Sequence, residues 1–345
     1  MNRFLPQPTG LPAGTHPAGR RSTGMRPRLR AAALALAALT AAAVAAGCTA
    51  PAGPPAPAAS GTPASTHKPA APASPAASTA VAPCDPAASS LAPLPGPPQV
   101  TPGSFMAKIK ARGHLIAGVD ANTYHFEYFN PRGGNFEGFD IDMIRAVAQA
   151  IFGNPNQVQY KAITDAERET DVNNGSVDIV AHTMTINCSR LEVVDFSTVY
   201  FDAHQQILVL DGSTVTGAAS LAGKKVCATG GSDSMGGIEP YHPKAVLVPY
   251  ITDCLVELQQ GQVAAITSDN SILEGLEIQD PYTKIVGPYL EDEPYGLAIA
   301  KTHPDFVRFV NAVLAQEEAS GAWKASYVKW LGGPAPQPPP VGYAS

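Results

Sequence analysis

From residue 105 onward, the apolar positions along the chain alternate between two periods. Short apolar runs predict buried strands at 114–119, 158–163, 177–182, 205–210, 224–229, 245–250, 263–267 and 284–287. Stretches with apolar positions on one face predict helices between them, first at 138–153 with Asp140 as its cap and last at 304–320 and 322–331. This alternation predicts an α/β fold with mixed sheets flanked by helices.

The folded part is long enough for two lobes. Its roughly 230 residues exceed what one sheet of this kind usually needs. We expect lobe 1 at 105–205 and 293–332 and lobe 2 at 206–292, with extended connections crossing between them near 200–208 and 290–298. Because open α/β sheets bind ligands at the carboxyl ends of their strands, the two lobes would face each other across a ligand cleft.

The first 48 residues have the pattern of a lipoprotein signal peptide. Arginines precede an apolar run at 31–46, which is shorter than the about 20 residues that a membrane span needs. Small residues at its end are followed by Cys48, as in a lipobox, which predicts a lipid anchor on Cys48 at the outer face of the cell membrane. The alternative is ordinary cleavage near Ala46. Residues 25–48 alone already form a complete signal, so Met1 and Met25 are both candidate starts.

Composition and charge change along the chain. Residues 49–104 are mostly Pro, Ala, Ser, Gly and Thr, a composition that predicts a disordered linker. A second Pro-rich stretch at 333–345 predicts a frayed tail. Removing the six arginines of residues 1–48 from the 23 basic residues leaves 17 against 29 acidic residues, a net charge of −12. This balance argues against nucleic acid as a partner, because binding it needs a basic face.

An exported chain with five cysteines is expected to form disulfides. With Cys48 lipidated, Cys84, Cys188, Cys227 and Cys254 allow three pairings. We favour Cys227–Cys254, the pair closest in sequence, which leaves Cys84–Cys188; free buried thiols are the alternative. The sequence has no C-x-x-C and no tight Cys/His cluster, so neither a metal site nor a cofactor is expected.

Polar residues follow several of the predicted strands. Arg190 comes shortly after strand 177–182 and is suited to hold a carboxylate with two hydrogen bonds. Thr183 and Thr185 share one face of the same segment, although strand propensity alone explains threonines there. Asp269 directly follows strand 263–267, either as a plain helix cap or as the partner of an ammonium group.

Two further strand ends add to this pattern. The turn "TGGSDS" at 229–234 contains Ser232 and Asp233 and precedes a predicted helix, whose N-terminus would favour an anion such as a carboxylate. Asp120 ends the first strand, and the aromatic residues after it either wall a pocket or pack in the core. Together, an arginine, a helix N-terminus, an aspartate and aromatic walls complement an α-amino acid.

The sequence resembles the extracellular solute-binding proteins, family 3, of polar amino acid ABC transporters, and among them the glutamate-binding lipoproteins of high-GC Gram-positive bacteria. The resemblance covers about 105–332. It rests on the segments "GVDANTYHFEY", "GFDIDM", "NNGSVDIVAHTMTINCSRLEVVDFSTVYF", "LAGKKVCATGGSDS", "VELQQGQVAAITSDNSIL" and "EPYGLAIAKTHPDFVRFVNAVL". It implies the two-lobed fold of type II periplasmic binding proteins.

The resemblance also implies a role for each candidate residue. Arg190 would bind the ligand's α-carboxylate, helped by the backbone N–H of Thr185 and by Ser232 and Asp233. Asp269 would bind the α-ammonium with the carbonyl of Thr183 and the hydroxyl of Thr185. The side-chain end of the ligand would be lined by Asp120 and by Tyr124 and Phe126.

The chain departs from glutamate-binding relatives at two points. His182 stands where a basic residue often precedes "TMT", and His204 and Gln206 stand where Gly and Lys or Arg are common. Glutamate is the first expectation for the ligand, followed by aspartate, asparagine or glutamine, and the loss of fixed positive charge leaves room for the two amides.

The expected function is therefore capture of a polar amino acid by lobe closure, without catalysis, for import by an ABC transporter permease. A monomer is expected. Two other functions fit the same fold: an enzyme of the prephenate or arogenate dehydratase kind, and an amino-acid sensor that contacts a membrane signalling partner. Turnover of prephenate would identify the enzyme, and neighbouring genes would separate transport from sensing.

Overall fold

The computed structural model of the chain describes residues 84–344. The predicted signal peptide with Cys48, and residues 49–83 of the predicted linker, lie outside the described residues. The described part consists of two lobes, each with its own sheet and its own apolar core.

Lobe 1 is built on a five-stranded mixed sheet with the strand order β5-β1-β6-β14-β7. Strand β1 pairs in parallel with β5 and β6, and β14 runs antiparallel to β6 and β7. A separate antiparallel sheet, β2-β3-β4, follows β1. The strands of lobe 1 are β1 (Leu115–Val119), β2 (Asn122–Thr123), β3 (Glu127–Asn130), β4 (Asn135–Glu137), β5 (Val158–Ala162), β6 (Ile179–Val180), β7 (Asp195–Phe196) and β14 (Ala298–Ile299).

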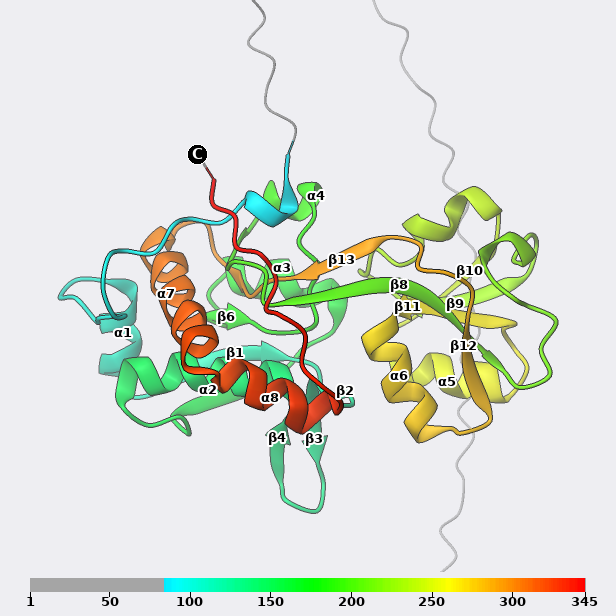
Figure 1. Cartoon of the computed structure of the whole chain (residues 1–345), viewed down its shortest axis with the longest axis horizontal. Helices are drawn as coiled ribbons and strands as arrows, with labels where there is room; N and C mark the ends of the chain where they lie inside the picture. The colour runs from blue at the N-terminus through cyan, green and yellow to red at the C-terminus, as the bar shows by residue number, and fades with distance from the viewer. Residues whose placement is uncertain (1–83, 345) are drawn as a thin grey trace, which may run out of the picture. The chain divides into compact units, whose positions relative to one another are not determined.

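The helices of lobe 1 cover this sheet, and the pair α7 and α8 packs against α2 (Figure 1). Their bounds are η1 (Pro86–Ala88), α1 (Phe105–Arg112), α2 (Phe139–Phe152), η2 (Asp165–Glu167), α3 (Arg168–Asn173), α4 (Cys188–Leu191), α7 (Pro304–Ser320) and α8 (Ala322–Leu331). The last two match the predicted helices residue for residue, because Pro304 starts one and Gly321 in a left-handed conformation (φ +82°) ends it.

Lobe 2 is built on a sheet with the order β10-β9-β11-β8-β12, and β13 also pairs with β8. The parallel strands β10, β9 and β11 all end at the same edge. The elements are β8 (Phe201–Leu210), η3 (Ala218–Ser220), β9 (Lys225–Thr229), η4 (Gly236–Tyr241), β10 (Lys244–Val248), α5 (Ile251–Gln259), β11 (Ala265–Asp269), α6 (Asn270–Gln279), β12 (Thr283–Val286) and β13 (Asp292–Tyr295).

Strands β8 and β13 connect the two lobes. Figure 1 shows them side by side between the helices of lobe 1 and helices α5 and α6 of lobe 2. They pair antiparallel from Phe201 with Tyr295 to His204 with Asp292, and β8 then continues into the sheet of lobe 2. These are the two places at which the apolar pattern predicts extended crossings.

Both predicted disulfides are present. Cys227 on β9 and Cys254 on α5 are fully buried in the core of lobe 2, with Cα atoms 5.5 Å apart. Cys84 and Cys188 have Cα atoms 5.9 Å apart and join the first described residue to the start of α4. The second disulfide therefore ties the N-terminal segment to the turn that carries Arg190.

Residues 84–104 are not a disordered linker, so the predicted linker boundary at 104 is wrong. The Ser90 hydroxyl donates to the carbonyl of Phe196 at 2.7 Å, and the Asn311 amide donates to Ser90 Oγ at 2.7 Å and to the carbonyl of Leu91 at 2.6 Å. The predicted frayed tail also packs here, since the Ala344 N–H donates to the Ser90 carbonyl at 2.8 Å. Composition did not predict that these two segments are ordered, because hydrogen bonds with lobe 1 and with each other satisfy their backbone groups.

Two local predictions need correction as well. Asp140 does not cap α2: the N-cap is Gly138, and the Asp140 side chain is fully buried inside lobe 1. No α-helix follows "TGGSDS"; the chain forms a turn there and then the short 3₁₀ helix η4. Ser232 and Asp233 therefore do not lie at an α-helix N-terminus.

Candidate functional site

Residues at or just after the carboxyl ends of six strands meet between the two lobes. They line a cavity of about 20 Å³, which is roughly the space that one water molecule needs. The strands are β1, β5 and β6 of lobe 1 and β9, β10 and β11 of lobe 2, so the carboxyl ends of both sets of parallel strands face the same space. The lining residues are Asp120, Thr123, Thr164, Asp165, His182, Thr183, Thr229, Pro249, Tyr250, Ile251, Ser268 and Ile272.

The segment after β6 is held in an unusual backbone conformation. Thr183 has φ +39°, which a β-branched residue rarely adopts. Its N–H donates to Asp140 Oδ2 at 2.9 Å, and Tyr200 donates to the other oxygen of Asp140 at 2.8 Å. The buried carboxylate at the start of α2 thus fixes the backbone of Thr183, and burial raises the pKa of Asp140.

The start of α2 can come this close because of a glycine. Gly138 has φ +139°, and a Cβ atom there would lie 1.9 Å from the carbonyl oxygen of Phe126. The Thr183 hydroxyl donates to Glu127 Oε1 at 3.3 Å, so a second buried carboxyl group supports the same residue. The "GFDIDM" segment therefore holds one wall of the site in place.

Arg190 is 6% exposed and lies between the lobes. Its Nη1 donates to the carbonyl of Thr185 at 2.7 Å and lies 3.1 Å from Asp233 Oδ2 of lobe 2. Its Nε lies 3.6 Å from Glu169 Oε1. Burial, and then the neighbouring charge of Arg168, lower the pKa of the Arg190 guanidinium. An anion beside this group is therefore required.

A second buried arginine was missed by the sequence reasoning. Arg168 is 3% exposed and pairs with Asp165 Oδ1 at 2.9 Å. It also donates to the His182 carbonyl at 3.2 Å and, across the lobes, to the Gly231 carbonyl at 3.2 Å. Burial is the largest influence and acts to raise the pKa of Asp165, but the charge of Arg168 together with His182 and a hydrogen bond from Thr229 outweighs it, and the pKa is lowered. The pair is therefore ionised and structural.

On the side of lobe 2, Asp269 and Glu293 form a pair of buried carboxyl groups. Tyr295 donates to Asp269 Oδ2 at 2.6 Å. Burial, and then the charge of Asp233, raise the pKa of Asp269 to about 7. Burial, and then the charge of Asp269, raise the pKa of Glu293 to about 9. An ammonium group placed here would favour ionisation of both.

Glu293 was also missed by the sequence reasoning. It lies on β13, and its strand meets the Thr185 segment: Thr185 and Tyr295 form a backbone bridge, and the Ile186 N–H donates to the Pro294 carbonyl at 2.7 Å. Thr185, Arg190, Asp233, Asp269 and Glu293 therefore meet where β13 joins the lobes. The sequence signal was available, because "DEP" lies in the predicted crossing at 290–298.

Asp120 and His182 lie at the other end of the site. Asp120 accepts from its own loop, from the Ala121 N–H at 2.6 Å and the Thr123 hydroxyl at 2.8 Å. The His182 Nε2 lies 3.1 Å from the Ile163 carbonyl. Its Nδ1 is buried without a hydrogen-bond partner among the residues the structure describes, 3.5 Å from Asp165 Oδ1.

The structure does not place the predicted aromatic walls at this cavity. Phe126 is fully buried in the core of lobe 1, in contact with Phe139 and Phe201. Tyr124 lines a different cavity, next to Trp330. Tyr250, two residues after β10, lines the cavity with its aromatic side chain. It was missed, although it is the last residue of the predicted strand 245–250.

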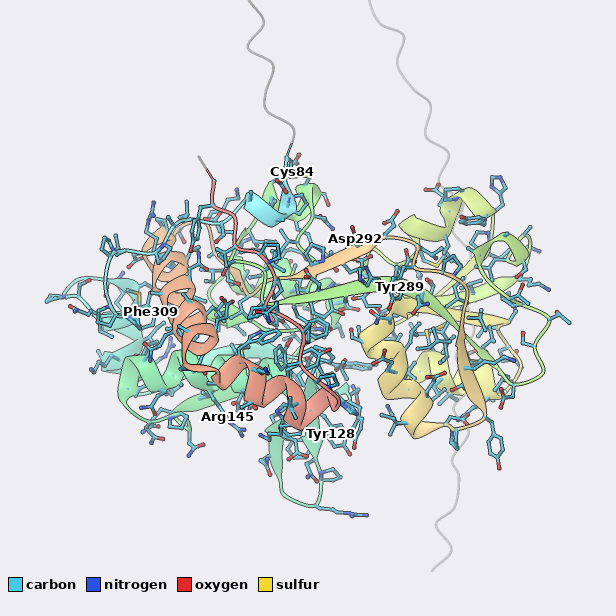
Figure 2. The ribbon with its side chains drawn as sticks, viewed as in Figure 1. Cys84, Tyr128, Arg145, Tyr289, Asp292 and Phe309 are labelled. Atoms are coloured by element: carbon cyan, nitrogen blue, oxygen red, sulfur yellow. A yellow bond between two sulfur atoms is a disulfide. The ribbon has the colours of Figure 1, made fainter. Side chains whose placement is uncertain are left out.

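The remaining predicted residues lie nearby or outside. Ser232 donates to the Thr229 carbonyl at 2.9 Å and does not line the cavity. His204 lies at the lobe crossing, stacked on Tyr289 with ring centroids 4.2 Å apart and 3.0 Å from Asp292 Oδ1. Figure 2 labels Tyr289 and Asp292 at this crossing.

Two lobes joined by paired strands, with charged and polar strand ends facing one another, define a two-lobed binding protein. Residues 115–333 match the model of the bacterial extracellular solute-binding proteins, family 3, and the chain belongs to that family.

Its similarities to individual proteins agree with this assignment. The chain is 35% identical over 229 residues to the ABC transporter glutamine-binding protein GlnH of Bacillus subtilis, a match covering 66% of this chain and 84% of that protein. It is 29% identical to the glutamate-binding protein GluB of Corynebacterium glutamicum, over 66% and 81% of the two chains. A crystal structure of the P235GK mutant of ArgBP from T. maritima superposes with a TM-score of 0.62 at 29% identity, over 66% and 99%. The fold is that of type II periplasmic binding proteins.

Two negative findings apply to residues 84–344 only. Within this range, no helix combines the length and the apolar character that a membrane crossing needs. The same residues contain no group of three His, Cys, Asp or Glu side chains arranged to hold a metal ion.

Proposed function

We propose that this protein captures a polar amino acid between its lobes and delivers it to an ABC transporter permease. The observation that carries the proposal is the separation of charge in the site. Arg190 of lobe 1 is a buried guanidinium suited to an α-carboxylate. Asp269 of lobe 2 and Glu293 of the crossing strand are buried carboxyl groups suited to an α-ammonium. The two poles of an α-amino acid would thus be held by different lobes.

We propose glutamine as the preferred ligand. Glutamate, the first expectation from the sequence, is the ligand with which its affinity is compared. Asp120 and Asp165 line the cavity, where the ligand's side chain would lie, and the neighbouring Arg168 is already paired with Asp165. An amide can donate to carboxylates, whereas a second carboxylate would be repelled. The name of the Bacillus relative, a glutamine-binding protein, supports this choice.

His182 is the residue that supports glutamate as an alternative ligand. Its Nδ1 faces the cavity end without a hydrogen-bond partner in the described part of the chain. An imidazole N–H at this atom would be a donor that a side-chain carboxylate could accept from.

Capture requires the lobes to separate and close. The cavity of about 20 Å³ is too small for any amino acid, so a ligand enters only when the lobes move apart. Because the ligand's full set of contacts exists only with both lobes around it, binding shifts the population toward the form in which the lobes are closed on the ligand. The paired strands β8 and β13 are the connection about which this motion would occur.

The remaining parts of the proposal rest on the sequence. Export, lipidation of Cys48, anchoring at the outer face of the membrane and a monomeric state complete the proposed importer subunit. The family and the relatives named above are solute-binding proteins, which favours binding over the dehydratase alternative. A signalling partner in place of a permease would be recognised by the genes next to this one.

Calorimetry of the purified protein with each of the twenty amino acids tests the function. We expect glutamine to bind with a micromolar dissociation constant, about 8 kcal/mol of free energy. Glutamate is the matched comparison, at pH 6 and pH 8. If no amino acid binds, the proposal fails; if glutamate binds more tightly at both pH values, the choice of glutamine is wrong.

A further inference from the structure

The contact between Arg190 and Asp233 is unusual for a site that must receive a carboxylate. Asp233 is a carboxylate of the opposite lobe, and its Oδ2 lies 3.1 Å from Nη1 of Arg190. The side-chain amide of Asn187 donates to the same oxygen at 2.9 Å. The same atom of Asp233 thus forms an ion pair with Arg190 and accepts a hydrogen bond from Asn187, both in lobe 1, as a ligand's carboxylate would.

We propose that Asp233 is a built-in competitor of the ligand: it occupies the carboxylate place on Arg190 and holds the lobes together until an amino acid displaces it. This inference rests on the proposed function. It reverses the role that the family resemblance implies for Asp233, which was to help bind the ligand's carboxylate.

The surroundings of the contact fit such an exchange. Asn187 caps α4, since its Oδ1 accepts from the Arg190 N–H at 2.9 Å, so the residue that orients Arg190 also binds Asp233. A buried guanidinium without an anion is costly. With Asp233 beside it before binding and the ligand's carboxylate beside it afterwards, Arg190 has an anion in both the free and the bound state, so neither state carries that cost.

The lobes also approach closely at the neighbouring residue. Gly231 has φ +93°, and a Cβ atom there would lie 2.6 Å from the backbone of Ala166 in lobe 1. Its carbonyl accepts from Arg168 at 3.2 Å and lies 3.5 Å from Nη2 of Arg190. The loop of Gly231 and Asp233 is therefore fitted closely against lobe 1.

A competitor of this kind lowers the apparent affinity for the ligand. Only the fraction of molecules in which Asp233 has left Arg190 is competent to bind, so the measured dissociation constant rises by the inverse of that fraction. Ligands that bind Arg190 weakly would fail to displace Asp233. The contact would thus set a threshold that favours a true α-amino acid over smaller carboxylates.

The test compares Asp233→Asn and Asp233→Ser with the wild type. Asp233→Asn keeps the shape of the side chain and removes its charge. Asp233→Ser shortens the side chain so that it no longer extends to Arg190. Glu239→Gln is the control, because Glu239 is an exposed residue of the same lobe and the substitution changes net charge equally. The readouts are the dissociation constant for glutamine by calorimetry and the radius of gyration of the ligand-free protein by small-angle scattering.

We expect both Asp233 variants to bind glutamine about tenfold more tightly than the wild type and to be more open without ligand, while Glu239→Gln changes neither property. Unchanged or weaker glutamine binding in both variants would overturn the proposal, as would an unchanged radius of gyration. If the wild type binds no amino acid, the proposed function fails instead. The scattering comparison still decides whether Asp233 holds the lobes together.

Discussion

The two lobes contribute to the candidate site in different ways. In lobe 1, the site residues are held by hydrogen bonds within their own lobe: the Asp120 carboxylate by its loop, the Thr183 N–H by Asp140, and Arg190 by the Thr185 carbonyl. In lobe 2, the Asp233 side chain contacts Arg190 and Asn187 of the other lobe. The site residues of lobe 1 are therefore preorganised, whereas the contacts of Asp233 in lobe 2 exist only when the lobes are closed.

This difference predicts which property each substitution changes. A preorganised group contributes binding energy without a cost of ordering. Substitutions in lobe 1 should therefore reduce affinity in either state of the lobes. Substitutions in lobe 2 should change affinity together with closure or with pH, because the carboxyl groups there change partner or protonation when a ligand arrives.

The largest effect is expected for Arg190→Ala. It removes the partner of the ligand's carboxylate, and truncating one member of a buried charge pair costs about 2–5 kcal/mol, which corresponds to a loss of affinity on the order of 30-fold or more. Calorimetry with glutamine measures it, and circular dichroism checks the fold. Arg132→Ala is the control, because Arg132 is exposed on the loop between β3 and β4. Undiminished binding by Arg190→Ala would refute the site.

Asp269→Asn should have the next largest effect. The amide keeps the shape of the side chain but loses the charge that pairs with the ligand's ammonium, and we expect affinity to fall about tenfold to a hundredfold. Asp292→Asn provides the control: it lies on β13 at the lobe crossing, and its side chain is 91% exposed (Figure 2). Equal losses in the two variants would mean that general charge, not the ammonium contact, explains the result.

The pH dependence of binding follows from the same carboxyl groups. With pKa values of about 7 for Asp269 and about 9 for Glu293, both are largely protonated at pH 6 in the free protein. The ligand's ammonium favours the ionised forms, so binding releases protons, and affinity should rise as the pH increases from 6 to 8. Calorimetry in two buffers with different ionisation enthalpies counts the protons released.

The stability of the free protein should change in the opposite direction. Because the folded-state pKa values are raised, these groups stabilise the fold fully below the unfolded pKa, near 4, and this contribution is lost as the pH rises through 7 and 9. Glu293→Gln should flatten the upper part of this curve. If that variant and the wild type show the same slope of melting temperature between pH 7 and pH 9, the assignment to Glu293 is wrong.

The sequence predicted the parts of the fold that depend on local pattern. Periodicity identified helices 304–320 and 322–331 and the strands, and it therefore located the strand ends that carry Asp120, Thr183 and Asp269. Periodicity could not show that Asp140 accepts a hydrogen bond from the Thr183 N–H, because that contact joins residues 43 positions apart. An acidic residue in the first turn of a helix resembles a simple cap.

The errors have the same physical origin. Phe126 and Tyr124 are neighbours of Asp120 in sequence, but core packing decides where their rings lie. Arg168 and Asp165 lie in a polar helical stretch that resembles a solvated face, and only tertiary structure buries them. Residues 84–104 have the composition of a linker, yet Asn311 and the chain end satisfy their backbone groups. In each case, contacts with residues that are distant in sequence decide the outcome; for Arg168 these are His182 and Gly231.

The smallest effect on binding is expected when the Cys84–Cys188 disulfide is removed, and it distinguishes this disulfide from Cys227–Cys254. Cys84–Cys188 joins the N-terminal segment to α4, the helix that carries Arg190, and Figure 2 shows Cys84 at the end of the described chain. The double variant Cys84→Ser, Cys188→Ser should free this turn and weaken glutamine binding a few-fold, because a displaced Arg190 loses geometry but not charge. Calorimetry of wild type and variant measures the change.

The matched comparison is Cys227→Ser with Cys254→Ser. These two sulfurs are fully buried between β9 and α5, and neither cysteine lines the cavity. Their loss should therefore cost about 2–5 kcal/mol of folding stability and leave the affinity of the folded fraction unchanged. Thermal unfolding and calorimetry on the same samples separate the two quantities. Removing the lobe 2 disulfide could instead weaken glutamine binding more than removing the lobe 1 disulfide. The position of Arg190 would then not depend on the Cys84–Cys188 disulfide, and the view of lobe 1 as the preorganised half would fail.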